Sequence, residues 1–233
     1  MAAKNSVKKF VDHGIYHIYN RGVEKRIIFV DDQDRAVFLS YLKTYLLPKD
    51  DAALHAVLTN PTSSSKEKDK TLKLLRLNNF TDSITLLAYC LMPNHFHLLV
   101  KQTEATTIDR FMNSFGVRYS MYFNRKYRRV GPLFQGLYKA VLVTTDEQFL
   151  HLTRYIHRNP LALASQDTLL QSYNYSSYPR YLGLTTTTWV HPEDILGYFQ
   201  KSGRRGYQKF VEGISEETYA PLIVHTCLDD DWI

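Results

Sequence analysis

Two histidines separated by a single residue are the strongest candidates for metal chemistry. His95 and His97 flank Phe96 in a run of alternating apolar residues. Side chains on a β-strand repeat every second residue, so both imidazoles are expected on one face, where they can bind one ion. Neutral imidazole suits zinc, manganese and other first-row metals, and magnesium is tolerated when oxygen ligands or phosphates complete the shell. The alternative is two surface histidines on an open face of a sheet.

A tyrosine and an asparagine four residues apart supply further groups. Residues at this spacing share one face of a helix, so Tyr155 and Asn159 are expected side by side. The unperturbed pKa of tyrosine is about 10, so phosphodiester cleavage by Tyr155 needs a metal beside it. Asn159 offers a neutral oxygen that binds a metal without repelling a phosphate. The alternative is a helix whose Tyr155 packs in the core and whose Asn159 ends it before Pro160.

Length and composition describe a globular protein with a weak preference for anionic partners. The chain has 233 residues, of which 44% are hydrophobic and 22% charged, a balance that excludes a disordered chain. This length suffices for one sizeable core or one domain with an appendage. The net charge of +6 and the 17 tyrosines suit unpaired nucleic acid, whose bases stack on aromatic rings. Tyrosines that fill a mixed core are the alternative.

The sequence shows no sign of membrane insertion, secretion or a disulfide framework. No run approaches the roughly 20 apolar residues of a membrane span. The N-terminus carries positive charges without an apolar run after them, so a secretory signal is not expected. Cys90 and Cys227 lie far apart without a paired motif. A reducing cytoplasm is therefore expected, and no zinc site built on cysteine.

Alternating and helical patterns predict the elements that position these residues. Strands are expected at residues 13–19, 84–91, 95–100 and 138–143. Helices are expected from Asp31 or Asp32 to before Pro48, over residues 107–125, and from Thr145 or Asp146 to about residue 158. A turn at Pro93 and Asn94 would join the second and third strands into a hairpin that carries both histidines.

This order of elements predicts an α+β fold, a ferredoxin-like split β-α-β sandwich. Its sheet is expected to be antiparallel, with the helices on one face. Residues 1–160 are interpreted as one domain and residues 161–233 as an appendage that packs on it. Residues 49–79 form an insertion with weak periodicity. Within it, residues 60–70 are interpreted as a solvated loop or a mobile insertion with a short helix on one side.

Several motifs together resemble those of a known family. They are YHIYNRG at residues 16–22, PNHFHLLV at 93–100, GPLFQGLYK at 131–139, YIHRNP at 155–160, YSSY at 175–178 and YLG at 181–183. In this combination the chain resembles the HUH single-tyrosine transposases of the IS200-like superfamily. Within them it is most similar to the REP-associated tyrosine transposases. The resemblance spans roughly residues 10 to 185, and the combination is specific although each motif alone is not.

The resemblance implies a metal-dependent endonuclease and strand transferase for single-stranded, hairpin-forming DNA. Carried over position by position, His95, His97 and Asn159 bind magnesium or manganese and Tyr155 is the nucleophile. Attack by the tyrosine leaves a 5′-phosphotyrosine and a free 3′-hydroxyl, and a second attack by a 3′-hydroxyl rejoins the strands. No nucleotide cofactor is expected. Relatives of this type work as monomers or as homodimers that share active sites, and the sequence leaves this open.

A basic turn mixed with tyrosines is the main candidate DNA-binding surface. Cations there would hold phosphates and aromatic rings would stack on bases. Two residues after the first strand could lie near the same face and read a base or hold a phosphate. A solvated basic turn is the alternative. The candidates are Asn20, Arg21, Tyr122, Arg125, Lys126, Tyr127, Arg128 and Arg129, while His157 is expected to be solvated or to touch DNA.

Three other functions remain open from the sequence. A domesticated relative would bind structured DNA without cutting it. An RNA-binding ferredoxin-like domain would carry stacking aromatics on its central strands, where this chain places two histidines. A hydrolase that uses metal-activated water would not need Tyr155.

Overall fold

A four-stranded antiparallel sheet forms the centre of the protein. The computed structural model describes residues 8–163 and 169–213. The strands are β1 (Ile15–Arg21), β2 (Ile84–Met92), β3 (His95–Gln102) and β4 (Lys139–Val143), and they lie side by side in the order β2-β3-β1-β4. Every neighbouring pair is antiparallel. This order confirms the predicted split β-α-β fold, because β3 lies between β1 and β2, and β1 lies between β3 and β4, so that each β-α-β unit is split by a strand of the other.

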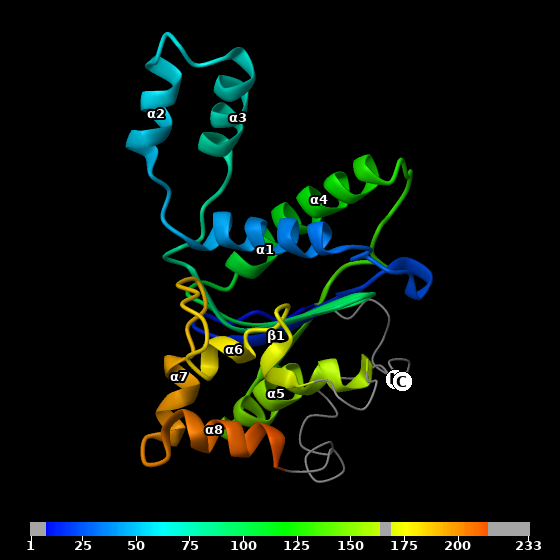
Figure 1. Ribbon diagram of the computed structural model, residues 1–233, viewed down its shortest axis with the longest axis vertical. Coiled ribbons are helices and arrows are strands. Elements are labelled where there is room, and N and C mark those ends of the chain that lie inside the picture. The colour runs from blue at the N-terminus through cyan, green and yellow to red at the C-terminus, as the bar shows by residue number, and fades with distance from the viewer. Residues whose placement is uncertain (1–7, 164–168, 214–233) are drawn as a thin grey trace.

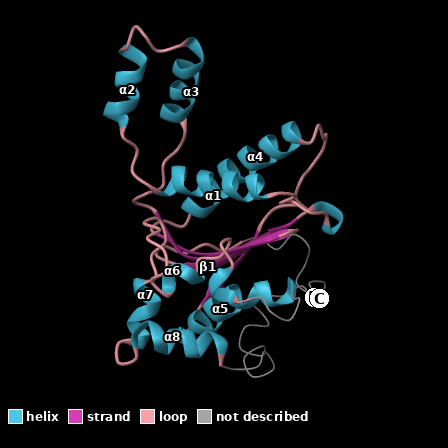
Figure 2. Ribbon diagram, in the orientation of Figure 1, coloured by secondary structure: helices cyan, strands magenta, loops and turns pink. Residues whose placement is uncertain are grey.

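The helices cover both faces of this sheet. The sequence predicted helices on one face of the sheet, which holds for the two crossover helices, α1 (Asp32–Leu46) and α4 (Thr107–Lys126), but not for the helices that follow β4 (Figures 1 and 2). Helix α5 (Asp146–Arg158) follows the last strand and packs on the opposite face. With it lie α6 (Tyr178–Tyr181), α7 (Glu193–Leu196) and α8 (Gly203–Glu212). Short 3₁₀ turns occupy Val23–Lys25, Asn159–Leu163, Leu170–Ser172 and Gly197–Phe199.

Strand alternation sorts the side chains of β3 between these two faces. Phe96 points to α1, where its ring packs 5.2 Å from that of Phe38, and Phe38 packs 4.6 Å from Phe115 of α4. All three rings are buried. His97, one residue on, points to the other face, where its ring lies 5.4 Å from that of Tyr155 on α5. Because side chains alternate along a strand, Phe96 joins the apolar core on one face of the sheet, and the histidines lie on the face that α5 covers.

The turn between β2 and β3 is held by the segment after β1. Ile28 N and Phe29 N donate to Pro93 O at 2.9 and 3.1 Å, and Gly22 N donates to Asn94 O at 2.8 Å. A Cβ at Gly22 would lie 2.2 Å from Arg26 O, so only glycine fits this close approach. These bonds fix the start of β3, from which His95 projects.

The insertion is a pair of helices, not the loop expected from the sequence. Helix α2 (Asp51–Thr59) begins at the N-cap Asp50, and α3 (Ser65–Arg76) begins at the N-cap Ser64. Ser64 and Glu67 form a capping box, in which each satisfies a backbone N–H of the other. The prediction was wrong because the weak periodicity of residues 60–70 concealed this local start signal.

The C-terminal elements run along the edge strand β2. Leu91 N donates to Tyr175 O, the Tyr181 hydroxyl donates to Leu87 O, and His191 N donates to Leu86 O, each at 2.9 Å. These bonds satisfy backbone groups that an open sheet edge would expose. Among the helices of the described ranges, none combines the length and apolar character of a bilayer span.

Candidate functional site

His95 and His97 begin strand β3 and project together under α5. Their ring centroids lie 4.9 Å apart, with the ring planes 87° to each other. Burial lowers the pKa of His95 to about 4, an effect that the charge of Arg21 adds to and the Asn159 hydrogen bond opposes. Burial, with His95 and His17 nearby, holds the pKa of His97 well below its usual value. Both rings are therefore neutral at pH 7, the form that binds metals.

The last turn of α5 brings Tyr155 and Asn159 to the same place. Thr145 caps the start of this helix by accepting from Gln148 N, and its buried positions include Leu152 and Ile156, which face the sheet side of the core. Asn159 Nδ2 donates to Tyr155 O at 3.0 Å, and Asn159 Oδ1 lies 3.5 Å from His95 Nε2. The structure thus brings together the four residues that the sequence predicted.

The donor atoms of His95 and Asn159 suit a cation. Asn94 Oδ1 lies 2.7 Å from His95 Nδ1, and because a carbonyl oxygen only accepts, the neutral ring carries its proton on Nδ1. Nε2 then presents a lone pair toward Asn159 Oδ1, whose partner nitrogen is turned toward Tyr155 O. An imidazole nitrogen and an amide oxygen that face one another are both metal-ligand atoms, so His95 and Asn159 would hold such a cation together.

The described residues do not form a metal site from charged or imidazole side chains alone. Within residues 8–163 and 169–213, no group of three or more His, Cys, Asp or Glu side chains is arranged to hold an ion. A metal at this site therefore needs the amide oxygen of Asn159 as well as the two histidines. Oxygen from an amide and from phosphate is the ligand chemistry of magnesium and manganese.

His17 belongs to the site, and sequence reasoning missed it. It lies on β1, beside β3, and its Nε2 is 2.9 Å from Nδ1 of His97 in a buried contact. Its ring also lies edge-on to Tyr155, with centroids 6.3 Å apart. A hydrogen bond to the second nitrogen of a ligating histidine fixes its tautomer and orientation. The HIY alternation of β1 gave the signal that His17 shares a face with Tyr19, but only the strand order places it against His97.

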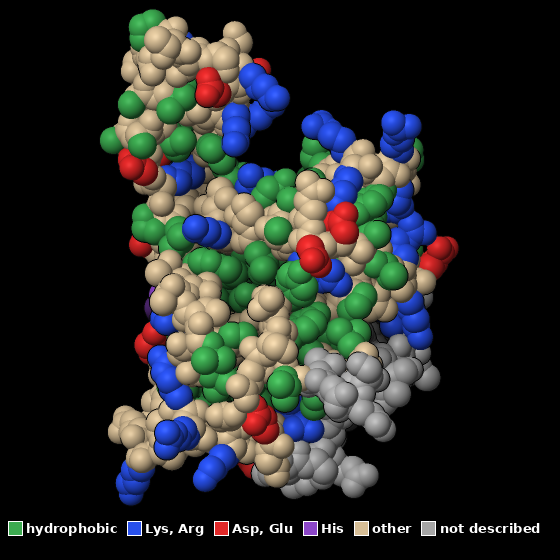
Figure 3. Space-filling view, in the orientation of Figure 1, with side chains coloured by type: hydrophobic (Ala, Val, Ile, Leu, Met, Phe, Trp, Pro, Cys, Tyr) green, Lys and Arg blue, Asp and Glu red, His purple; other side chains and the backbone are tan. Residues whose placement is uncertain are grey.

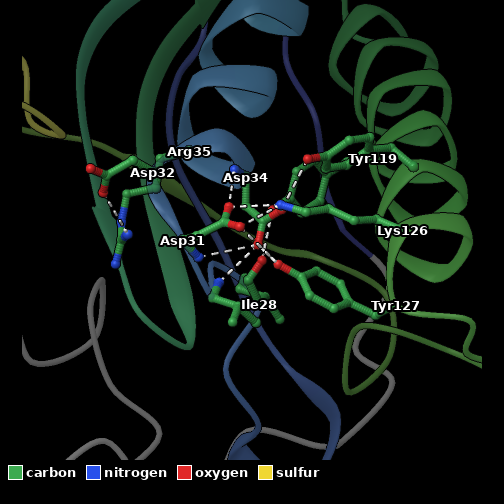
Figure 4. Close-up of polar contacts among 10 residues, drawn as sticks. Ile28, Asp31, Asp32, Asp34, Arg35, Tyr119, Lys126 and Tyr127 are labelled. Carbon is green, nitrogen blue, oxygen red and sulfur yellow. Dashed lines mark hydrogen bonds and ion pairs between the residues drawn. The ribbon is translucent and has the colours of Figure 1, made fainter.

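Three candidate DNA-binding side chains direct their polar ends into a cluster between α1 and α4, of which Figure 4 labels Lys126 and Tyr127. Lys126 Nζ lies 2.8 Å from Asp34 Oδ1 and 2.7 Å from Asp31 Oδ2. The hydroxyls of Tyr122 and Tyr127 donate to Asp34 at 3.0 and 2.8 Å. Asp34 is fully buried. Lys126, Tyr122 and Tyr127 therefore bind the start of α1 to the end of α4.

The arginines of the same turn differ in exposure. Arg125 and Arg128 are exposed, and Arg128 has a positive φ of 51° at the point where the chain leaves the helix. Arg129 is half-buried and donates to Asn124 Oδ1 at 2.9 Å. Arg125 and Arg128 are thus the cations of this turn best placed to meet a phosphate.

Asn20 and Arg21 are buried against the loop that precedes β4. Asn20 Nδ2 donates to Gly136 O at 3.1 Å, and the Arg21 guanidinium donates to Gln135 Oε1. Arg21 also stands opposite His95 in the β1–β3 register. These two side chains hold the loop over the end of the sheet beside the histidines.

His157 is neither solvated nor exposed to a ligand, contrary to both expectations from the sequence. It is fully buried. Its Nδ1 lies 2.7 Å from the Tyr207 hydroxyl of α8, and its Nε2 lies 2.8 Å from Ser177 Oγ before α6. Burial lowers its pKa to about 3. His157 therefore fastens α5 to the C-terminal elements, on the helix face away from the site.

Comparison with known proteins agrees with this geometry. Residues 60–159 match the family model described as "Transposase IS200 like", a segment that contains His95, His97, Tyr155 and Asn159. The chain is therefore similar to this family over residues 60–159, in agreement with the resemblance of its motifs.

Two solved structures are similar to this chain at low identity. One is a REP-associated tyrosine transposase bound to a REP hairpin, with 10% identity and a TM-score of 0.45 over 81% of this chain and 97% of the other. The second is a Deinococcus radiodurans R1 protein assigned as a transposase, with 15% identity and a TM-score of 0.33 over 68% and 96%. No curated protein matches the chain. The similarity to the IS200-like transposases rests on the match of residues 60–159.

Proposed function

We propose that this protein is a transposase, a metal-dependent single-stranded DNA endonuclease and strand transferase with Tyr155 as its nucleophile. One observation carries the proposal: residues far apart in the sequence meet here, with Asn159 Oδ1 3.5 Å from His95 Nε2 and the ring centroid of Tyr155 5.4 Å from that of His97. His95, His97 and Asn159 are the groups that would hold magnesium or manganese. A bound divalent ion would supply Lewis-acid polarisation of the scissile phosphate.

The reaction balances without a nucleotide cofactor. The Tyr155 hydroxyl oxygen attacks the phosphorus, the phenolic proton passes to solvent, and the bond from phosphorus to the 3′-oxygen breaks. The products are a 5′-phosphotyrosine and a strand with a free 3′-hydroxyl. Attack by a 3′-hydroxyl on the phosphotyrosine then joins two strands and restores the phenol. One phosphodiester replaces another at each cycle.

The residues around Tyr155 fit this role. Asn159 accepts no proton and carries no charge, so it does not repel the incoming phosphate. Asn94 and His17 hold the two histidines in fixed orientations, which reduces reorganisation when DNA arrives. Arg125 and Arg128 are the proposed phosphate contacts of the basic turn. The hairpin-forming character of the DNA follows from the family resemblance of the motifs.

The formation of a covalent protein–DNA adduct tests the proposed function. The protein is incubated with a labelled hairpin oligonucleotide that has a single-stranded extension, with Mn²⁺ or Mg²⁺, and separated on a denaturing gel. The wild type should give a protein–DNA adduct that EDTA abolishes and Tyr155→Phe does not form. Tyr198→Phe, at a tyrosine that is 48% exposed and lies outside the site, is the matched control and should form it.

Each other outcome contradicts part of the proposal. An adduct that survives in Tyr155→Phe moves the nucleophile to another tyrosine. Cleavage without an adduct indicates hydrolysis by activated water. Binding without cleavage indicates a domesticated module that recognises structured DNA.

A further inference from the structure

Helices α2 and α3 form an arm that projects from the body of the protein (Figure 1). Helix α2 buries none of its residues and α3 buries only Thr71. The base of the arm is nonetheless fixed, because Lys49 Nζ donates to Leu75 O at 3.1 Å and also to Leu77 O, and Asn79 Nδ2 donates to Leu47 O at 2.7 Å. The base of the arm is therefore fixed to the body of the protein, but the arm contributes no side chain to the core around the candidate site.

One side of α3 carries a row of lysines. Lys66, Lys70 and Lys73 are all exposed, and their spacing of four and three residues puts them on one face of the helix. Leu75, on the other side, is half-buried. The row extends about 10 Å along the helix axis. Duplex DNA carries one charge per roughly 1.7 Å of its axis, so a row of this length can meet several phosphates.

The acidic residues of α3 do little to neutralise this row. The helix contains five basic and two acidic side chains. Glu67 is turned back to the helix start, where its carboxylate accepts from Ser64 N at 2.8 Å and from the Ser64 hydroxyl at 2.7 Å. Only Asp69 remains among the lysines on the outer surface. The face of the lysine row is therefore a net cationic surface.

The arm and α4 stand on either side of an open notch. Figure 3 shows this notch between α3 and the distal part of α4, with Lys and Arg side chains on both sides of it. Arg125, near the end of α4, is one exposed cation on that helix. Two basic surfaces on either side of a notch attract a polyanion into the space between them.

The composition of the arm identifies the form of nucleic acid that it fits. Residues 51–76 contain no Phe, Tyr or Trp, whereas surfaces for unpaired strands combine cations with aromatic rings on which bases stack. Cations alone contact the phosphates of a duplex. We infer that the lysine row of α3 binds the phosphate backbone of the base-paired stem of the DNA substrate. This inference rests on the proposed function for the identity of the substrate.

Binding measured by fluorescence anisotropy tests the inference on the full chain. Two labelled oligonucleotides of equal length are compared, one with a hairpin stem and one whose stem sequence is altered so that it cannot pair. The test variant is Lys66→Ala/Lys70→Ala/Lys73→Ala. The control variant, Lys201→Ala/Arg205→Ala/Lys209→Ala, removes three exposed charges from the C-terminal region and leaves the arm intact.

The test variant should weaken hairpin binding about tenfold or more near 0.1 M salt, and should reduce the slope of log K against log salt by about 2 to 3. Its affinity for the unpaired oligonucleotide, and the control variant's affinity for the hairpin, should change less than about twofold. Lys66→Arg/Lys70→Arg/Lys73→Arg should bind the hairpin like the wild type, which separates charge from arm folding.

An unchanged hairpin affinity and salt slope in the alanine variant would overturn the inference. Equal losses for the two oligonucleotides, or for the test and control variants, would also overturn it, because they indicate a general charge effect. The Tyr155 adduct is scored separately on the hairpin oligonucleotide that carries a single-stranded extension. If the wild type forms none, the proposed cleavage fails while the binding comparison still decides the role of the arm.

Discussion

The Nε2 atom of His17 on β1 lies 2.9 Å from the Nδ1 atom of His97 on β3, in a contact buried from solvent. This contact occupies one nitrogen of His97 with a neighbour in the sheet. The other nitrogen, Nε2, is then the one that would bind the metal in the proposed site. The strand that precedes the histidine pair by some 80 residues therefore sets the orientation of one member of that pair.

His17→Phe should lower the affinity for Mn²⁺ by about 10- to 100-fold, because the ring of His97 loses the partner that fixes its tautomer. Isothermal titration calorimetry with Mn²⁺, and the Mn²⁺ concentration needed for adduct formation, measure this effect. His17→Gln, whose amide can still accept from Nδ1, should recover part of it. His55→Gln, on the arm, is the control. Unchanged Mn²⁺ affinity in His17→Phe would rule out the positioning role.

Asp34→Ala should destabilise the protein by about 3 kcal/mol, because it removes a buried carboxylate that binds Lys126, Tyr122 and Tyr127. Urea unfolding followed by circular dichroism measures the change. Arg125→Ala, one residue from Lys126, should change the free energy of unfolding by less than about 0.5 kcal/mol but weaken DNA binding. Equal stability losses in the two variants would show that the cluster has no special role.

The stability contributed by Asp31 should depend on pH. Hydrogen bonds from Lys126, then from Asp34 N, lower the pKa of Asp31 in the folded protein. Its unfolded value is about 3.9, so its contribution is complete above that pH and is lost as the pH falls through the folded pKa. The unfolding temperature of the wild type should exceed that of Asp31→Asn above about pH 5. The two should converge toward pH 2, and a constant difference would contradict the charge assignment.

His157→Leu should cost about 3 kcal/mol of folding free energy, because it leaves the buried Tyr207 hydroxyl without its hydrogen bond and removes one from Ser177. Thermal unfolding measures the loss. His55→Leu, at an exposed position, should stay within about 0.5 kcal/mol. A loss of that small size in His157→Leu as well would mean that the contacts between α5 and α8 do not depend on this histidine.

Local patterns predicted much of the fold because its signals are short-range. The alternation around Phe96 predicted β3, and the caps at Asp31 and Thr145 predicted the starts of α1 and α5. The arm was missed although Ser64 and Glu67 carry a capping box, because polar, lysine-rich sequence also suits a solvated loop. The side on which α5 packs could not be predicted, since no local signal specifies it.

For the site, the sequence by itself determined that His95 and His97 share a strand face and that Tyr155 and Asn159 share a helix face. These facts follow from the side-chain repeat of two residues along a strand and of 3.6 residues around a helix. Only the tertiary structure decided that the two faces meet, with Asn159 Oδ1 at 3.5 Å from His95 Nε2, and that His17 joins them. The tertiary structure also decided that Lys126 forms an ion pair with Asp34. Long-range contacts of this kind depend on strand order and helix packing, which no local pattern encodes.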